Sequence, residues 1–362
     1  MEQRQIKELK PPLYDRHVED GAKMVPFAGY LMPLHYTSAL KEHKAVRSGA
    51  GLFDVSHMGR IDIEGEGAEK FLDFLSTNKI VGKPIGSATY TVLSDGEGVP
   101  IDDVIILRVD AHRFSLVANA ANKVKVLNHL LQWNEGAQIH PRFETHGIIA
   151  LQGPDSTEIA EHLFSQISKL PPMQCAEYDF QGEKVLVSAT GYTGERGFEF
   201  MALYPQIISL WEYFTRKGAV SIGLAARDSL RLEMGFALYG HELSETITSV
   251  ESVSAWTIKW DHDFLGREHL KKVSQRDSKR SAYGVILPGG AIAREGAAVY
   301  DGKKKVGYVT SGGFSPSLQQ PIALILVQGK YKPEDRLTVE VRGQPLEAHI
   351  TRLPFFNKKA KK

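Results

Sequence analysis

Two adjacent carboxylates, Asp102 and Asp103, follow a Gly-rich turn and open a strongly apolar run. This run predicts a strand over residues 101–109. Because side chains alternate across a strand, the two carboxylates must point to opposite faces, and only one of them can face any single site. A carboxylate here is either a solvated residue at the start of a strand or a partly desolvated acid or base. The residues alone leave both interpretations open.

A second candidate lies in the segment 185–200, which reads as two strands joined by the connection Gly191-Tyr192-Thr193-Gly194. Alternation puts Phe198 and Phe200 on one face of the second strand and Glu199 on the other. If both faces are covered, Glu199 needs a donor. A carboxylate can accept two parallel N–H bonds from a 2-amino-4-oxo heterocycle, as it does from a guanidinium group. The alternative is a surface glutamate.

Two arginines, Arg227 and Arg231, lie one helical turn apart beside an apolar stripe. Such a pair suits a carboxylate or phosphate ligand. Pairing with Asp228 or Glu233, or plain solvation, is the more common outcome.

Composition excludes several classes of protein. The 362 residues carry 44 basic and 43 acidic side chains, so the net charge of +1 provides no field for a nucleic-acid scaffold. The lone Cys175 cannot form an internal disulfide or a cysteine metal site, and we expect it to have no role. There is no phosphate-binding glycine loop, dinucleotide fingerprint or HExxH motif, and we expect no metal. A polar N-terminus and a longest apolar run of six residues, 322–327, predict a cytoplasmic protein with no membrane contact.

The order of elements predicts a mixed α+β protein followed by a small all-β domain. Apolar residues at helical spacing predict helices over 68–75, 124–133 and 207–214. Strands are expected at 59–64, 88–93, 101–109, 114–118, 147–151 and 185–190, and after a polar linker at 271–281 they are expected at 285–287, 305–310, 322–327 and 337–341. The lysines at 358, 359, 361 and 362 are either a solvated end or a docking segment.

Several ordered blocks of the sequence resemble one known family. They are Phe53-Asp54-Val55-Ser56-His57-Met58-Gly59, Ile101-Asp102-Asp103, Val117-Ala118-Asn119-Ala120, Leu151-Gln152-Gly153-Pro154, Thr190-Gly191-Tyr192-Thr193-Gly194-Glu195, Gly223-Leu224-Ala225-Ala226-Arg227-Asp228, Leu238-Tyr239-Gly240 and Ser311-Gly312-Gly313-Phe314-Ser315-Pro316. Together they look like the signature blocks of aminomethyltransferases, the T-proteins of the glycine cleavage system. The resemblance covers nearly the whole chain, from about residue 13 to residue 356.

This resemblance implies a three-lobed cloverleaf with ferredoxin-like α+β lobes and a C-terminal β-barrel around a tetrahydrofolate channel. On that basis we expect a folate-binding body over residues 1–275 and a barrel over 276–362. Within the body, residues of about 55–140 would form one lobe, and residues 1–54 plus 141–275 the other.

The resemblance also implies the reaction. The methylene of an aminomethyl group on the lipoyl arm of H-protein moves to tetrahydrofolate, giving 5,10-methylenetetrahydrofolate, ammonia and dihydrolipoyl H-protein. Carried over by motif, the catalytic aspartate looks like Asp103, and the folate-contacting residues look like Tyr90, Asn119, Tyr192, Glu199 and Arg227. Tetrahydrofolate would be a cosubstrate, and no metal would be needed.

Two alternatives and two departures remain. The alternatives are another free-standing folate-dependent demethylase and a non-catalytic folate-binding iron–sulfur assembly factor of the same fold. Glu177 stands where some relatives have a tyrosine, and Asn357 where relatives often have a basic residue, so no ligand contact is carried to either.

Overall fold

The computed structural model describes residues 8–357. The expectations for the first seven residues and for Lys358, Lys359, Lys361 and Lys362 therefore lie outside the described residues. Contacts group the chain into two compact units, a first unit of Met1–Phe71, Ile80–Thr89 and Val104–Arg227 and a second unit of Leu72–Lys79, Tyr90–Asp103 and Asp228–Lys362. The units are assembled from alternating stretches of chain, and the expected domain bounds stay a prediction.

The largest sheet of the first unit has six strands in the order β10-β11-β12-β9-β3-β13, of which only the β13–β3 pair is parallel. Its strands are β3 (Gly51–Asp54), β9 (His146–Gln152), β10 (Cys175–Phe180), β11 (Glu183–Ser188), β12 (Gly197–Leu203) and β13 (Val220–Ile222). The expected strand–connection–strand over 185–200 is confirmed as the antiparallel pair β11–β12.

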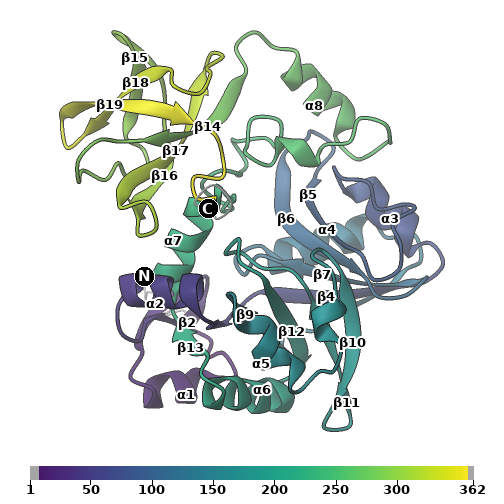
Figure 1. Cartoon of the computed structure of the whole chain (residues 1–362). Coiled ribbons are helices and arrows are strands. Elements are labelled where there is room, and N and C mark those ends of the chain that lie inside the picture. The colour runs from purple at the N-terminus through teal and green to yellow at the C-terminus, as the bar shows by residue number, and fades with distance from the viewer. Residues whose placement is uncertain (1–7, 358–362) are drawn as a thin grey trace, which may run out of the picture. The chain divides into compact units, whose positions relative to one another are not determined.

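Helix α6 (Tyr204–Arg216) packs against β9 and β12 of this sheet, and it is drawn below them in Figure 1. Proline stands in its first turn, where a missing N–H costs nothing. Ile207, Leu210, Trp211 and Phe214 recur at helical spacing and are all completely buried in the core beneath the sheet. This stripe is the reason that the predicted helix over 207–214 is confirmed.

A second sheet has five strands in the order β5-β6-β7-β4-β8. Its strands are β4 (Gly59–Glu64), β5 (Ala88–Ser94), β6 (Pro100–Arg108), β7 (Arg113–Ala118) and β8 (Gln138–Pro141), with helices α3 (Ala68–Leu75) and α4 (Lys123–Trp133) between them in sequence. The predicted helices and strands of this region are confirmed to within one residue at each end. Along β6, Asp102 is completely buried and Asp103 is partly exposed, as alternation requires.

The remaining elements of the first unit are shorter. They are α1 (Tyr14–Glu19), β1 (Lys23–Phe27), β2 (Tyr30–His35), α2 (Ala39–Ser48), α5 (Ser156–Glu161) and the 3₁₀ turn η1 (Ile167–Lys169). Ser38 caps α2 by accepting from the backbone N–H of Lys41. The buried Glu42 accepts from the N–H groups of Tyr36, Thr37 and Gly223, which fixes the start of this helix.

The second unit contains the predicted C-terminal β-barrel, which is confirmed as closed, in the order β14-β17-β16-β15-β18-β19. Its strands are β14 (Arg280–Ile286), β15 (Ala298–Asp301), β16 (Lys304–Ser315), β17 (Gln320–Gln328), β18 (Arg336–Val341) and β19 (Gln344–Thr351), drawn from green to yellow in Figure 1. Strand β17 is an unbroken apolar run because both of its faces are covered. Ala323, Ile325 and Val327 fill the barrel, while Ile322 and Leu324 pack outside it with Leu232 and Phe355.

Helix α7 (Leu224–Met234) ends in the second unit, where a buried ion pair joins it to the barrel. The Arg231 guanidinium donates to Glu242 at 3.0 Å, to Asp228 at 2.8 Å and to the Ser311 hydroxyl at 2.9 Å. Arg231 and Glu242 are only 2% and 1% exposed. Arg231 therefore has a structural role, and the interpretation that it pairs with Asp228 is confirmed.

The predicted polar linker over 271–281 is wrong at both ends, because β14 already includes residues 280 and 281. Helix α8 (Arg267–Ser274) includes residues 271–274. Its apolar face is only two residues wide, Leu270 and Val273, and both pack with Phe264 in a small cluster of their own. Two apolar residues among several lysines do not form a helical pattern that can be recognised in the sequence.

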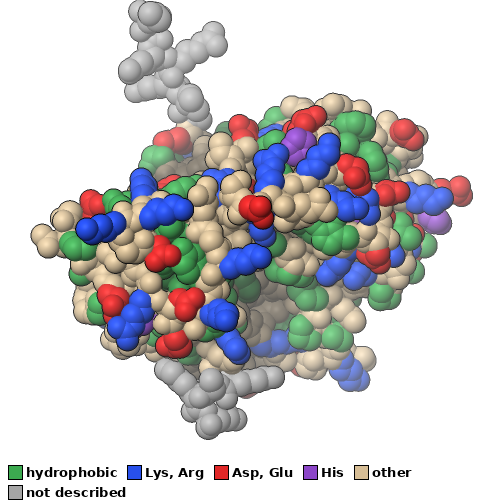
Figure 2. All heavy atoms as spheres, turned by 90° about the horizontal axis from the view of Figure 1, so that it is seen from above, with side chains coloured by type: hydrophobic (Ala, Val, Ile, Leu, Met, Phe, Trp, Pro, Cys, Tyr) green, Lys and Arg blue, Asp and Glu red, His purple; other side chains and the backbone are tan. Residues whose placement is uncertain are grey.

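In residues 8–357, no helix is both long enough and apolar enough to cross a bilayer. Basic and acidic side chains are interspersed over the face drawn in Figure 2, with no large patch of one sign.

We predict that the Arg231–Glu242 pair stabilises the second unit only while both partners are present. Removing one partner leaves a buried charge uncompensated, so Arg231→Met should lower the free energy of unfolding by about 3–5 kcal/mol. The double variant Arg231→Met/Glu242→Met should recover most of that loss, as measured by urea unfolding. Arg336→Met, which breaks an exposed pair with Glu347, is the control and should cost less than about 1 kcal/mol. A double variant as unstable as the single one would contradict this account.

Candidate functional site

The predicted catalytic carboxylate, Asp103, is hydrogen-bonded to a predicted ligand-contacting residue, Tyr90. Tyr90 lies on β5 and Asp103 on β6, which are neighbours in the sheet. The Tyr90 hydroxyl donates to Asp103 Oδ2 at 2.9 Å, and it lies 2.8 Å from Ser254 Oγ. Because the phenol has one proton and gives it to Asp103, Ser254 donates to Tyr90. The carboxylate is thus oriented by a phenol that is itself held in place.

Sequence reasoning assigned no part in the site to the segment that supports this pair. The Trp256 ring stacks on Tyr90 at 5.8 Å with 25° between the planes, and Trp256 is 61% exposed. It belongs to the 3₁₀ turn η2 (Ala255–Thr257), whose Thr257 hydroxyl donates to the Ser254 carbonyl at 2.8 Å. Isolated serine and tryptophan residues in a loop carry no periodic signal that would have marked them.

Glu199 is confirmed on the face of β12 opposite the buried Phe198 and Phe200. Its Oε2 accepts a short hydrogen bond from the Thr190 hydroxyl, which is 2.6 Å from Ser188 Oγ. Burial raises the pKa of the Glu199 carboxyl, and the Thr190 hydrogen bond and the Arg227 charge only partly oppose that shift. In the described part of the chain, Thr190 is the only hydrogen-bond donor to this carboxylate.

Arg227, in the first turn of α7, lies over a predicted ligand-contacting aromatic ring. Its guanidinium carbon is 4.6 Å from the centroid of the Tyr192 ring, a cation–π contact. An Arg227 Nη2 also lies 4.0 Å from the Met58 sulfur. Glu199, Arg227 and Tyr192 therefore belong to one side-chain group of the first unit.

His57, next to Met58, is buried in the same unit. Burial, reinforced by the positive charges of Arg227 and Lys123, lowers the pKa of His57 to about 3. Its Nδ1 has no hydrogen-bond partner within residues 8–357. The Lys123 ammonium donates to the Tyr30 hydroxyl at 2.5 Å and to the His57 carbonyl at 3.3 Å, and burial lowers the pKa of Lys123 to about 8. A neutral imidazole is what this cationic surrounding favours.

The chain before His57 is fixed by a buried network. His17 Nε2 bonds Asp54 Oδ2 at 2.9 Å, and its Nδ1 bonds the Tyr36 hydroxyl at 2.8 Å. Asp54 Oδ1 also accepts from the N–H of Ser56 at 2.8 Å, and the hydrogen bonds lower the pKa of Asp54 despite its burial. This network explains the Asp54-Val55-Ser56 part of the signature block.

Asn119 follows β7, and its carbonyl accepts from the N–H of Asn122 at the turn into α4. The structure thus places four of the predicted residues, Asn119, Tyr192, Glu199 and Arg227, in the first unit, and Tyr90 and Asp103 in the second. The ligand contacts themselves stay predictions.

Two other residues singled out in the sequence, Cys175 and Glu177, are held by contacts within the fold. Cys175 is 4% exposed, with its sulfur 3.8 Å from the Arg108 carbonyl oxygen, and burial raises the pKa of its thiol to about 12. Glu177 accepts two bonds from the Arg113 guanidinium, at 3.0 and 2.8 Å. This two-bond contact between a guanidinium and a carboxylate is a structural ion pair that joins β7 and β10.

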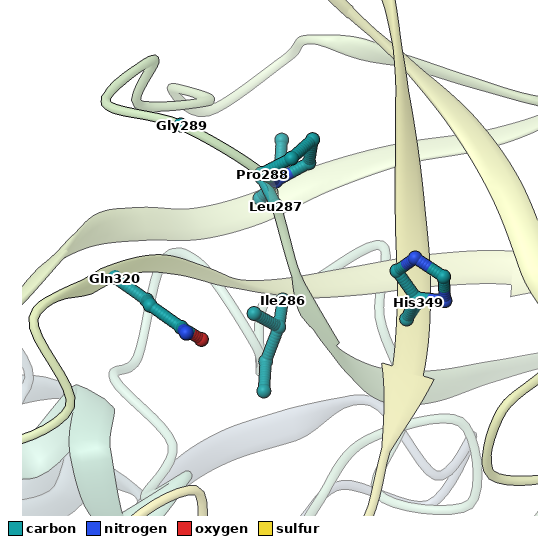
Figure 3. A pocket seen from close by; sticks show the side chains of 6 residues that line it. All are labelled: Ile286, Leu287, Pro288, Gly289, Gln320 and His349. Carbon is teal, nitrogen blue, oxygen red and sulfur yellow. The ribbon is translucent and has the colours of Figure 1, made fainter.

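Two further features lie outside this group. A hollow of about 280 Å³ on the barrel is lined by Ile286, Leu287, Pro288, Gly289, Gln320 and His349 (Figure 3), and none of the predicted site residues is among them. In the part of the chain that the structure describes, no cluster of His, Cys, Asp or Glu is arranged to hold a metal ion.

Comparison with known proteins decides the family. Residues 13–262 match the GCVT N-terminal domain, and residues 280–357 match the glycine cleavage T-protein C-terminal barrel domain. The chain belongs to the glycine cleavage T-protein family of aminomethyltransferases. It is 39% identical over 355 residues to an aminomethyltransferase of Pseudothermotoga lettingae, with 96% of this chain and 98% of that protein covered. It is 40% identical over 362 residues to one of Prosthecochloris aestuarii, with 96% and 99% covered.

The structure agrees with this family. The crystal structure of glycine cleavage system aminomethyltransferase T from Bartonella henselae superposes with a TM-score of 0.88 at 32% identity, covering 96% of this chain and 98% of that one. The resemblance inferred from the sequence blocks, the α+β class and the transferase assignment are therefore confirmed. The demethylase and iron–sulfur assembly alternatives are not favoured, because full-length relatives at this identity are aminomethyltransferases.

We predict that His57 stays neutral in the folded aminomethyltransferase well into the acid range. Because its folded pKa of about 3 is below the ordinary 6.5, the unfolded chain binds the proton first. This site should therefore remove about 1.4 kcal/mol of stability per pH unit as pH falls from about 6.5 to about 3. The slope of unfolding free energy against pH should be shallower by that amount in His57→Gln than in the wild type. His112→Gln, at an exposed position, is the control, and equal slopes in all three proteins would refute the prediction.

Proposed function

We propose that this aminomethyltransferase uses tetrahydrofolate as its acceptor and lipoylated H-protein as its donor. The C–S bond to the aminomethyl carbon breaks, and that carbon ends bonded to N5 and N10 of the folate. The amino nitrogen leaves as ammonia, and the sulfur is left as a thiol of dihydrolipoyl H-protein. The observation that carries the proposal is the Asp103 carboxylate, which points out of β6 and is oriented by Tyr90 in a chain of this family.

Asp103 is the proposed catalytic residue. A carboxylate held at a fixed angle can orient the attacking nitrogen, accept its proton and stabilise positive charge on the carbon that leaves sulfur. Tyr90 and Ser254 restrict the carboxylate to one orientation before any ligand arrives. Such preorganisation avoids the cost of ordering the group during the reaction.

Glu199 is the proposed partner of the folate ring. Its pKa is raised because the carboxylate is desolvated with too few donors. The pterin's 2-amino group and adjacent ring N–H present two parallel donors, which match the two oxygens of a carboxylate. The Arg227–Tyr192 stack offers a flat cationic face beside it, and we assign Asn119 to the same ligand.

We also propose that the enzyme works in the cytoplasm. Its one thiol, Cys175, is buried and forms no disulfide. A free thiol fits a reducing compartment. The proposed function is tested by mixing the protein with aminomethylated H-protein, with and without tetrahydrofolate. Ammonia and 5,10-methylenetetrahydrofolate should form rapidly only when the folate is present, and the absence of acceleration by folate would overturn the proposal.

We predict that Asp103→Asn lowers kcat by about 10²- to 10⁴-fold, the range for losing a general acid–base group. Folate affinity, measured by calorimetry, should stay within a few-fold of the wild type because the amide preserves the shape of the side chain. Asp110→Asn, at an exposed position, is the control and should keep full activity. Full turnover by Asp103→Asn would remove Asp103 from the mechanism.

We predict that Glu199→Gln weakens tetrahydrofolate binding by about 1.5–3 kcal/mol, or roughly 10- to 150-fold, because charge-assisted hydrogen bonds are lost. The measurement is the Kd for tetrahydrofolate. The matched control is Glu183→Gln at an exposed position on the neighbouring strand β11, which should bind normally. An unchanged Kd in Glu199→Gln would show that this carboxylate does not contact the ring.

A further inference from the structure

We infer that Gln152 is a positioning residue for the ring-binding side chains, which it holds through the loop of residues 190–194. This inference rests on the proposed function, because that function assigns Tyr192 and Glu199 to folate. Gln152 is the last residue of β9 and is 1% exposed. Its side chain lies against the loop that carries Tyr192.

Both ends of the Gln152 amide are used by this loop. Its Nε2 donates to the Thr190 carbonyl at 3.1 Å, and its Oε1 accepts from the Thr193 hydroxyl at 2.9 Å. The two anchor points stand on either side of Tyr192 in the chain. A side chain with both a donor and an acceptor is needed to hold them, and neither Glu nor an apolar residue provides both.

The same amide explains two glycines, Gly191 in the connection and Gly197 at the start of β12. A Cβ added to Gly191 would lie 1.9 Å from Gln152 Oε1, and one added to Gly197 would lie 2.4 Å from Gln152 Nε2. A side chain at either position would overlap the Gln152 amide, so both positions must be glycine. Gly194 supplies the positive φ of 75° that turns the chain back toward β12.

The loop passes this support to the ring-binding side chains. Thr190, whose carbonyl Gln152 holds, donates its hydroxyl to Glu199. Tyr192, between the two anchors, forms the face on which Arg227 lies. From the other side, Arg47 of α2 donates to the Thr193 carbonyl at 2.7 Å and to Glu195 at 3.1 Å. Gln152 thus acts on Glu199 and Tyr192 through residues it binds.

A buried amide is tolerated when its groups are paired, as both groups of Gln152 are, so the hydrogen bonds by themselves fit a structural role as well as a positioning role. Loss of a purely structural amide would lower stability and leave the remaining folded enzyme normal. Loss of a positioning residue would instead weaken folate binding in the folded enzyme, while the aminomethyl donor is handled as before.

The experiment compares the wild type with Gln152→Met, which keeps the length of the side chain and removes both hydrogen bonds. Thr193→Val, which removes the hydroxyl that donates to Oε1 and accepts from the Glu195 N–H at 3.2 Å, is the milder second variant. Gln138→Met, on β8 of the same unit at an exposed position, is the matched control. For each folded protein we would measure the Kd and KM for tetrahydrofolate, kcat, the KM for aminomethylated H-protein and the melting temperature.

The expected result is a rise of about tenfold in the tetrahydrofolate Kd and KM of Gln152→Met, equivalent to ~1.4 kcal/mol. Its kcat and its KM for H-protein should stay within twofold, and Gln138→Met should match the wild type. Thr193→Val should show a smaller rise, and the rise in the double variant should be less than the product of the two single rises, because the two residues share one interaction.

A folded Gln152→Met enzyme with wild-type folate affinity would overturn the inference, as would a fall in kcat with no change in KM. If Gln152→Met does not fold, Thr193→Val decides, and an unchanged Kd in that variant overturns the inference. A wild-type protein that binds no tetrahydrofolate would instead overturn the proposed function itself.

Discussion

The alternation of side chains along an extended strand decides where both candidate carboxylates point. On β12, the core beneath the six-stranded sheet requires Phe198 and Phe200, so Glu199 must leave on the other face. On β6, Asp102 is inside and Asp103 is left to meet the Tyr90 hydroxyl. Hydrophobic packing therefore decides which face of each strand carries the carboxylate, and a shift of either strand by one residue would turn its carboxylate to the opposite face of its sheet.

The number of hydrogen bonds that a buried carboxylate accepts separates structural carboxylates from the proposed ligand-binding one. Glu242 accepts from Arg231 and from the Thr310 hydroxyl, and Glu233 accepts from both the Ser315 and Ser317 hydroxyls. Each of these carboxylates accepts at least three hydrogen bonds from the protein. Glu199 has one hydroxyl donor within the described residues and a raised pKa. A carboxylate left short of donors in this way is poised for a ligand that brings its own N–H groups.

The sequence was informative wherever a pattern repeats or a motif is long. The period of two predicted that Asp102 and Asp103 diverge, and the stripe of α6 predicted that helix. It was uninformative where the contact is a single side chain reaching across the fold. Nothing near Ser254 or Gln152 in the chain marks their partners at Tyr90 and Thr193, because those pairings exist only after folding. Helix α8 was missed because its buried face is two residues wide.

The burial of Cys175 has a consequence for exchange chemistry. The proposed reaction leaves a dithiol on the partner's arm, and only the oxidised, disulfide form of such an arm can exchange with a protein thiolate. A thiol that is 4% exposed and has a pKa of about 12 is almost never ionised or reachable near neutral pH. The enzyme therefore offers no thiolate that could attack the oxidised arm of the proposed carrier, so thiol–disulfide exchange cannot link the two proteins covalently.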